Sequence, residues 1–139
     1  MDKEKQPGIN FDSIILAREK FWRNPVLPQE LDIKIDFKAK KSIDKDNQKG
    51  IIELDTFLSL QDSEKVDKVK LELKYIGIFS IIESEKNMDL EHFLEYNAPA
   101  LLLPYIREQI TSITAKAGIL PVILPPLNIL AMIKENEKK

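Results

Sequence analysis

The sequence predicts an α+β domain in which helices cover one face of a sheet, because its two halves follow different patterns. Between Leu31 and Tyr75, apolar and polar residues alternate, which is typical of strands with one buried face. From Leu90 onward, apolar residues recur instead at the spacing of amphipathic helices. All of the predicted strands therefore precede the helices.

The N-terminal part is the least regular. Residues 1–9 show no periodicity, so we expect a disordered tail there, followed by a single domain over residues 10–134. Segment 13–23 opens with an apolar run that suits a strand and continues with residues that suit a helix; we interpret it as a strand. Two prolines make residues 24–28 a loop, because proline lacks a backbone donor and fixes φ.

The next strands have clearer patterns. Alternation predicts them over residues 31–39, 52–60 and 69–75, separated by a polar loop at 42–50 and a turn at 61–65, and the last strand continues into an end at 76–81 that becomes apolar on both sides. Short connections join neighbouring strands, so we expect at least these strands to form an antiparallel meander.

The long helix is predicted between Asn97, its cap, and Gly118, its C-terminal stop. Pro99 falls in the first turn, where a missing N–H is tolerated, and Pro104 should distort the helix. Its apolar stripe comprises Leu102, Ile106, Ile110, Ile113 and Ala117.

Shorter helices are expected on either side of the long one. The first has an apolar edge at Leu90, Phe93 and Leu94, with Asn87 or Asp89 as its cap. The second covers residues 129–133 and is followed by a charged tail at residues 135–139.

Composition excludes several classes of function. A net charge of -2 gives no electrostatic reason to bind nucleic acid, and no apolar run is long enough to insert into a membrane. We therefore expect a cytoplasmic protein. The chain has no cysteine, His92 is its single histidine, and its few glycines lack the spacing of nucleotide-binding loops. We expect no catalytic residues, no metal site, no cofactor and no enzyme activity.

An apolar segment with three prolines, residues 119–127, follows the long helix and suits neither a helix nor a central strand. It either lies along the edge of the core or, together with loop 24–28, forms the wall of a hydrophobic groove for another chain. Under the second interpretation the peptide-binding candidates are Val26, Leu27, Ile119, Leu120, Val122, Ile123, Leu124 and Leu127.

Three sequence blocks, at residues 77–81, 104–112 and 120–128, resemble the SecB family of bacterial protein-export chaperones in their residues, order and spacing. The resemblance implies a four-stranded antiparallel sheet backed by the long helix, assembled as a homotetramer that is a dimer of dimers. It also implies an ATP-independent holdase, which binds unfolded or precursor polypeptides between the loops at 25–28 and 119–127 and passes them to the motor SecA.

The positions that match the family's SecA-docking surface are Glu19, Arg23, Lys70 and Glu72. Because only Glu19 and Glu72 are acidic, we expect SecA binding to be weak or absent and sensitive to salt. Two other functions stay open: a SecB-like chaperone dedicated to one partner, such as an antitoxin, and an interaction or oligomerisation domain without chaperone activity.

Overall fold

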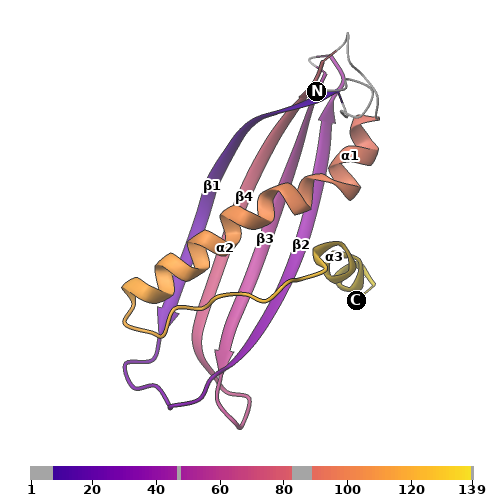
Figure 1. Ribbon diagram of the computed structural model, residues 1–139. Helices are drawn as coiled ribbons and strands as arrows, with labels where there is room; N and C mark the ends of the chain where they lie inside the picture. The colour runs from indigo at the N-terminus through magenta and orange to yellow at the C-terminus, as the bar shows by residue number, and fades with distance from the viewer. Residues whose placement is uncertain (1–7, 47, 83–88, 139) are drawn as a thin grey trace.

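A computed structural model describes residues 8–46, 48–82 and 89–138 of the chain. Within these residues, four long strands form one antiparallel sheet and three helices lie against one of its faces (Figure 1). The α+β prediction, with a long helix on one sheet face, is confirmed. The elements are β1 (Ile9–Arg23), β2 (Asp32–Asp44), β3 (Lys49–Gln61), β4 (Asp67–Ile81), α1 (Leu90–Tyr96), α2 (Ala98–Lys116) and α3 (Ile129–Glu137).

The strand order in the sheet is β1-β4-β3-β2. Strands β2, β3 and β4 form the predicted meander, and segment 13–23 is a strand, as predicted. Because β1 lies at the opposite edge, beside β4, residues 24–31 cross the ends of β4 and β3 before they enter β2 (Figure 1). This crossing brings a proline-containing loop to the end of the sheet where α2 also ends.

The predicted loop at residues 42–50 is wrong over most of its length. Strand β2 continues to Asp44, β3 begins at Lys49, and these two residues pair across the ladder. Ladder hydrogen bonds use main-chain groups, so polar side chains can remain in solvent while the strands continue. The hairpin is therefore much shorter than its composition suggested.

Regular structure extends into the described parts of both predicted tails. Residues 135–137, placed in a charged tail from the sequence, belong to α3, and the Asn136 Nδ2 donates a hydrogen bond to the Phe37 carbonyl at 2.7 Å. Strand β1 already starts at Ile9. Residues 1–7 and 139 of the expected tails, and the possible cap Asn87, lie outside the described residues.

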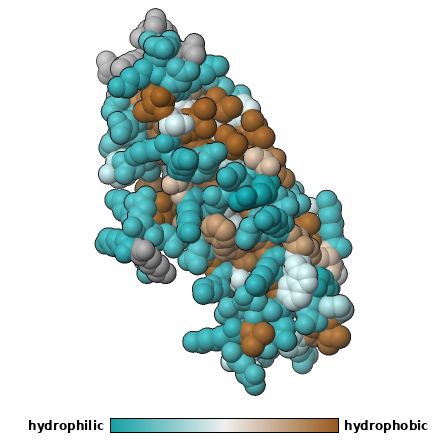
Figure 2. Space-filling view, turned by 180° about the vertical axis from the view of Figure 1, so that it is seen from behind, coloured by the Kyte–Doolittle hydropathy of each residue, from teal (hydrophilic) through white to brown (hydrophobic). Residues whose placement is uncertain are grey.

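Alternation along β4 separates the two faces of the sheet. Leu71, Leu73 and Phe79 are buried beneath the helices, whereas Lys70 and Glu72 lie on the other face, which we call the outer face. The outer face is largely hydrophilic, with hydrophobic side chains gathered toward one end (Figure 2). Fully buried residues on the helix side also include Phe37, Ile52, Leu54, Leu58, Leu102, Ile106 and Ile110.

Helix α2 presents the predicted apolar stripe to the sheet. Leu102, Ile106 and Ile110 have no exposed surface, while Ile113 and Ala117 are half-buried against the core. Its opposite side is open to solvent. No helix in the described part of the chain is both long and apolar enough to span a membrane.

The ends of α2 lie where the sequence predicts them. Asn97 precedes the helix, although its side chain makes no capping hydrogen bond, and the helix continues through Pro104. Gly118 has a φ of 71°, a left-handed conformation that favours glycine. The next N–H, of Ile119, donates to the Thr114 carbonyl at 3.1 Å, which completes a Schellman motif. The chain thus leaves α2 in a fixed direction, toward the end of the sheet.

Candidate peptide-binding groove

Loop 24–31 and the segment after α2 meet at the end of the sheet and enclose a groove of about 730 Å³. The groove takes its residues from both proline-containing segments and from the adjoining strand ends, so the two segments do converge. Its lining residues are Leu27, Pro28, Gln29, Glu30, Leu31, Asp32, Ile33, Leu60, Gly118, Ile119, Leu120, Pro121, Val122 and Ile123.

The predicted binding residues of the 119–127 segment fall into two groups. Leu120 and Ile123 are 88% and 78% exposed. In contrast, Ile119, Val122 and Leu124 are buried in the core, although the first two contribute to the groove wall. A bound chain would therefore meet mainly Leu120 and Ile123, while their buried neighbours anchor the segment.

The remaining candidates, Val26, Leu27 and Leu127, lie in three different surroundings. Leu27 is half-buried and lines the groove, and Val26 is 79% exposed in the same loop. Leu127 is half-buried and lines a separate shallow hollow of about 460 Å³, together with Ala100 and Ile129. Of the eight candidates, the structure therefore brings five together at the groove: Leu27, Ile119, Leu120, Val122 and Ile123. Val26 lies exposed outside the lining, Leu124 is buried, and Leu127 lies in the second hollow.

Side chains of α2 hold the main chain of the 119–127 segment. The Thr111 hydroxyl donates to the Val122 carbonyl at 2.7 Å, and the Val122 N–H donates to the Thr114 hydroxyl at 2.9 Å. The Arg107 guanidinium donates to the carbonyls of Leu124 and Pro125. These bonds satisfy the polar backbone of an irregular segment that packs on the core. They also leave the side chains of this segment to alternate between core and solvent.

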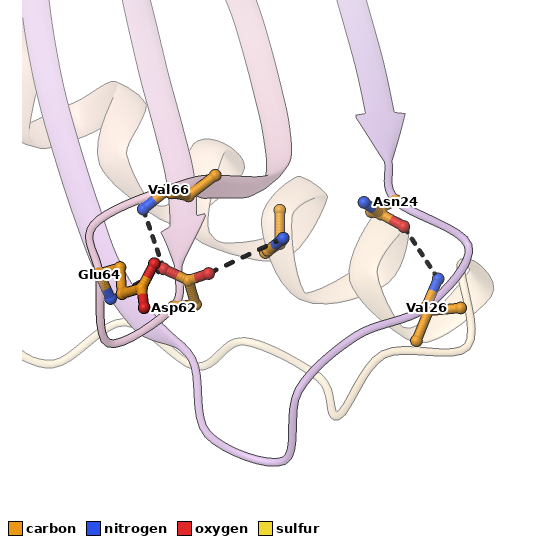
Figure 3. Close-up of polar contacts among 6 residues, drawn as sticks. Asn24, Val26, Asp62, Glu64 and Val66 are labelled. Atoms are coloured by element: carbon orange, nitrogen blue, oxygen red, sulfur yellow. Dashed lines mark hydrogen bonds and ion pairs between the residues drawn. The ribbon is translucent and has the colours of Figure 1, made fainter.

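A local turn shapes the opposite wall. The Asn24 Oδ1 accepts a hydrogen bond from the Val26 N–H at 3.0 Å, which directs the chain away from β1 (Figure 3). The Asn24 N–H in turn donates to the Lys68 carbonyl at 2.8 Å and fixes the start of the loop to β4. Val26 is held at the surface by this arrangement.

Sequence reasoning missed the part of the groove that the strand ends supply. Ile33 lies in register with buried Leu60, on the helix side of the sheet, but it is 44% exposed. A strand pattern alone predicts burial for such a residue. The length of the predicted strands could have indicated this exposure. Their apolar face extends beyond the region that one helix can cover, so residues near the strand ends remain uncovered.

Two carboxylates give the groove its charge. Glu30 and Asp32 are exposed, and they are the charged residues among those that line it. The remaining lining residues are apolar or neutral. The site can therefore accept an apolar segment and attract a cationic group at its edge.

The positions matched to SecA docking do not share one surface. In the β1–β4 register, Glu19 lies opposite buried Leu73 and Arg23 lies opposite buried Val69, so both are on the helix side. The Gln109 side chain of α2 also donates to Glu19. Lys70 and Glu72 lie on the outer face, where their partners on β1 are Trp22 and Lys20.

A family model described as preprotein translocase subunit SecB matches residues 13–139, which include both walls of the groove. The chain belongs to the SecB family. The match covers every strand and helix of the described structure, apart from the start of β1.

Two relatives that carry the SecB name agree with this assignment, and a third similar protein is uncharacterized. A protein-export protein SecB of Neorickettsia sennetsu is 29% identical over 120 residues, which cover 80% of this chain and 70% of the relative. One from Magnetococcus marinus is 24% identical over 133 residues, covering 90% and 82%. An uncharacterized protein of Methanocaldococcus jannaschii is 30% identical over 142 residues, covering 99% of this chain and 90% of that protein.

A solved structure confirms the SecB-like fold. The SecB-like chaperone of Mycobacterium tuberculosis, in complex with a ChAD peptide from an antitoxin, superposes with a TM-score of 0.73. The superposition covers 86% of this chain and 91% of that chain, at 19% sequence identity. The predicted resemblance to SecB and the predicted four-stranded antiparallel sheet are both confirmed. Membership of this family supports a chaperone role.

Proposed function

We propose that this protein is an ATP-independent holdase that binds unfolded or precursor polypeptides in the cytoplasm, for protein export. The observation that carries the proposal is the groove at the end of the sheet, with Leu120 and Ile123 exposed on a segment whose backbone is tied to α2. Unfolded chains differ in sequence but share apolar segments, so broad aliphatic contact on a fixed frame suits many of them. Family membership supports the same role.

The groove also suggests which client segments bind best. Because Glu30 and Asp32 are its charged lining residues, we expect apolar segments flanked by Lys or Arg to bind more tightly than segments flanked by acidic residues. Raising the salt concentration should reduce this difference.

We further propose that the chain assembles as a homotetramer, a dimer of dimers. Strand β1 is a free edge of the sheet, and long free edges pair readily with other chains. Phe11 and Leu16 on this strand, and Leu101 and Tyr105 on α2, are each more than a third exposed. Copies that cover this side would remove both the open edge and the apolar area, whereas a monomer at micromolar concentration would contradict the proposal.

A chaperone dedicated to one partner is the second candidate. It is favoured by the M. tuberculosis chaperone, whose structure holds an antitoxin peptide and which shares this fold. Such a protein would use the same groove, with a narrower range of clients.

A holdase assay against several unrelated, chemically denatured proteins tests these functions, with the oligomer mass measured alongside. Suppression of aggregation for most of them supports the general holdase. Protection of a single partner only would identify the dedicated chaperone. Protection of none, by a chain that is folded and oligomeric, would leave an interaction or oligomerisation domain and contradict the proposed function.

A further inference from the structure

Arg23 connects the two walls of the groove. It is the last residue of β1 and lies on the helix side of the sheet. Its Nε and Nη2 atoms donate to the carbonyls of Asn24 and Pro25, each at 3.1 Å, and its Nη1 donates to the carbonyl of Ala117. One side chain thus bonds the start of loop 24–31 and the end of α2.

The position of Arg23 also suits its charge. Ala117 is the C-terminal cap of α2, where carbonyl groups without helical partners give the helix end a partial negative charge. A β-carbon built at Gly118 would lie 3.7 Å from the Arg23 Nη1, so the guanidinium also lies close to the residue that joins α2 to segment 119–127 and lines the groove. The planar guanidinium can donate hydrogen bonds to several carbonyls at once. A lysine ammonium on a flexible stem is less suited to this geometry.

We propose that Arg23 is a positioning residue for client binding, because it fixes the separation of the two groove walls. The inference rests on the proposed holdase function. Arg23 need not touch the client. It holds Leu27 on one wall and Leu120 on the other at a fixed distance across the groove. Because the loops are already ordered, they lose less conformational entropy when a client binds.

Three single variants separate positioning from simple stabilisation. Arg23→Gln removes the bridge, and Arg23→Lys keeps a positive charge at the helix end without the fork. Arg18→Gln is the matched control, because it removes an arginine from the same strand on the outer face. We expect client dissociation to be about tenfold faster in both Arg23 variants and unchanged in Arg18→Gln.

A second readout follows the distance between loop 24–31 and the C-terminal end of α2, the two elements that Arg23 joins, without any client. The chain has no native cysteine, so Gln29→Cys and Ala115→Cys can carry spin labels for pulsed dipolar distance measurement. Labelled chain is diluted into unlabelled chain so that only distances within one chain are read. The distance distribution should broaden when Arg23→Gln is added.

Each outcome decides the inference. Client binding equal to that of the parent in folded Arg23→Gln, or full recovery of binding in Arg23→Lys, would overturn it. If Arg23→Gln fails to fold, Arg23→Lys decides by the same two readouts. If the parent chain binds no client, the proposed function fails, and an unchanged distance distribution would then separately overturn the positioning role.

Discussion

Lys20 and Glu72 lie opposite each other on β1 and β4, on the outer face of the sheet. Glu19, the neighbour of Lys20, points to the helix side and accepts a hydrogen bond from Gln109. The carboxylate of Glu72 therefore lies among basic outer-face residues, because Lys70 and Lys74 flank it on the same strand. A basic partner surface would meet a mixed charge pattern here.

For SecA, this geometry predicts weak binding that charge reversal on the outer face should improve. The double variant Lys20→Glu and Lys70→Glu should raise SecA affinity and make it more dependent on salt, since it joins new carboxylates to Glu72. Affinity is measured by titration at two salt concentrations. Glu19→Gln, on the helix side, is the control and should change nothing. No gain in the double variant would show that this face does not dock SecA.

Strand identity was predictable because the inner face of the sheet is apolar along its length. Leu54 and Leu58 on β3, and Leu71 and Leu73 on β4, alternate with polar residues and are all buried on the helix side. The position of β1 was not predictable, since its pairing with β4 joins residues far apart in the chain. Consequently the face of Glu19 and Arg23 could not be derived either, because it depends on the register of that pairing.

Individual burial within the 119–127 segment also escaped prediction. Its Leu, Ile and Val residues are chemically alike, and they follow no helical or strand period. Which of them are exposed is decided by two hydrogen bonds of the Val122 main chain: its carbonyl accepts from the Thr111 hydroxyl, and its N–H donates to the Thr114 hydroxyl. Sequence spacing does not reveal such contacts, which is why Leu124 was included among the binding residues although it is buried.

The Thr114 hydroxyl should contribute measurably to stability. Thr114→Val leaves the buried N–H of Val122 without its acceptor, so the free energy of unfolding should fall by about 1–3 kcal/mol. Thr56→Val is the matched comparison. Within the described residues the Thr56 hydroxyl is buried without a hydrogen-bond partner, so this change should be neutral or stabilising. Urea unfolding measures both variants, and equal losses would contradict the assigned bonds.

Asp62 should make part of the stability dependent on pH. Hydrogen bonds from the Val66 N–H and the Glu64 N–H to its carboxylate, with a weaker contribution from Lys68, lower the pKa of Asp62 (Figure 3). A lowered pKa in the folded state means that the stabilisation is present at neutral pH. It is lost as the pH falls through the folded-state pKa, below about pH 4.

The variant Asp62→Asn tests this dependence. It should lose less stability than the parent between neutral pH and about pH 2, because it has no carboxylate to protonate. Chemical unfolding at several pH values measures the effect. Glu64→Gln, in the same turn, is the charge control. A parental pH profile in Asp62→Asn would show that this carboxylate does not contribute.

In segment 119–127, buried side chains anchor the segment to the core and exposed side chains are free to contact a client. Leu124 is an anchor, 4% exposed, so Leu124→Ala should lower the free energy of unfolding by about 2–5 kcal/mol. Leu120 and Ile123 project into solvent, and replacing both with Ser should change stability by only about 0.5 kcal/mol for each site.

The double variant Leu120→Ser and Ile123→Ser therefore provides the most direct test of the proposed client site. Its thermal melt and its affinity for a chemically unfolded client are measured on the same preparation, beside the parent chain. We expect a melting temperature close to that of the parent and an affinity lower by about tenfold or more, because two aliphatic contacts are lost. A folded double variant that binds the client as tightly as the parent would contradict the groove as the client site.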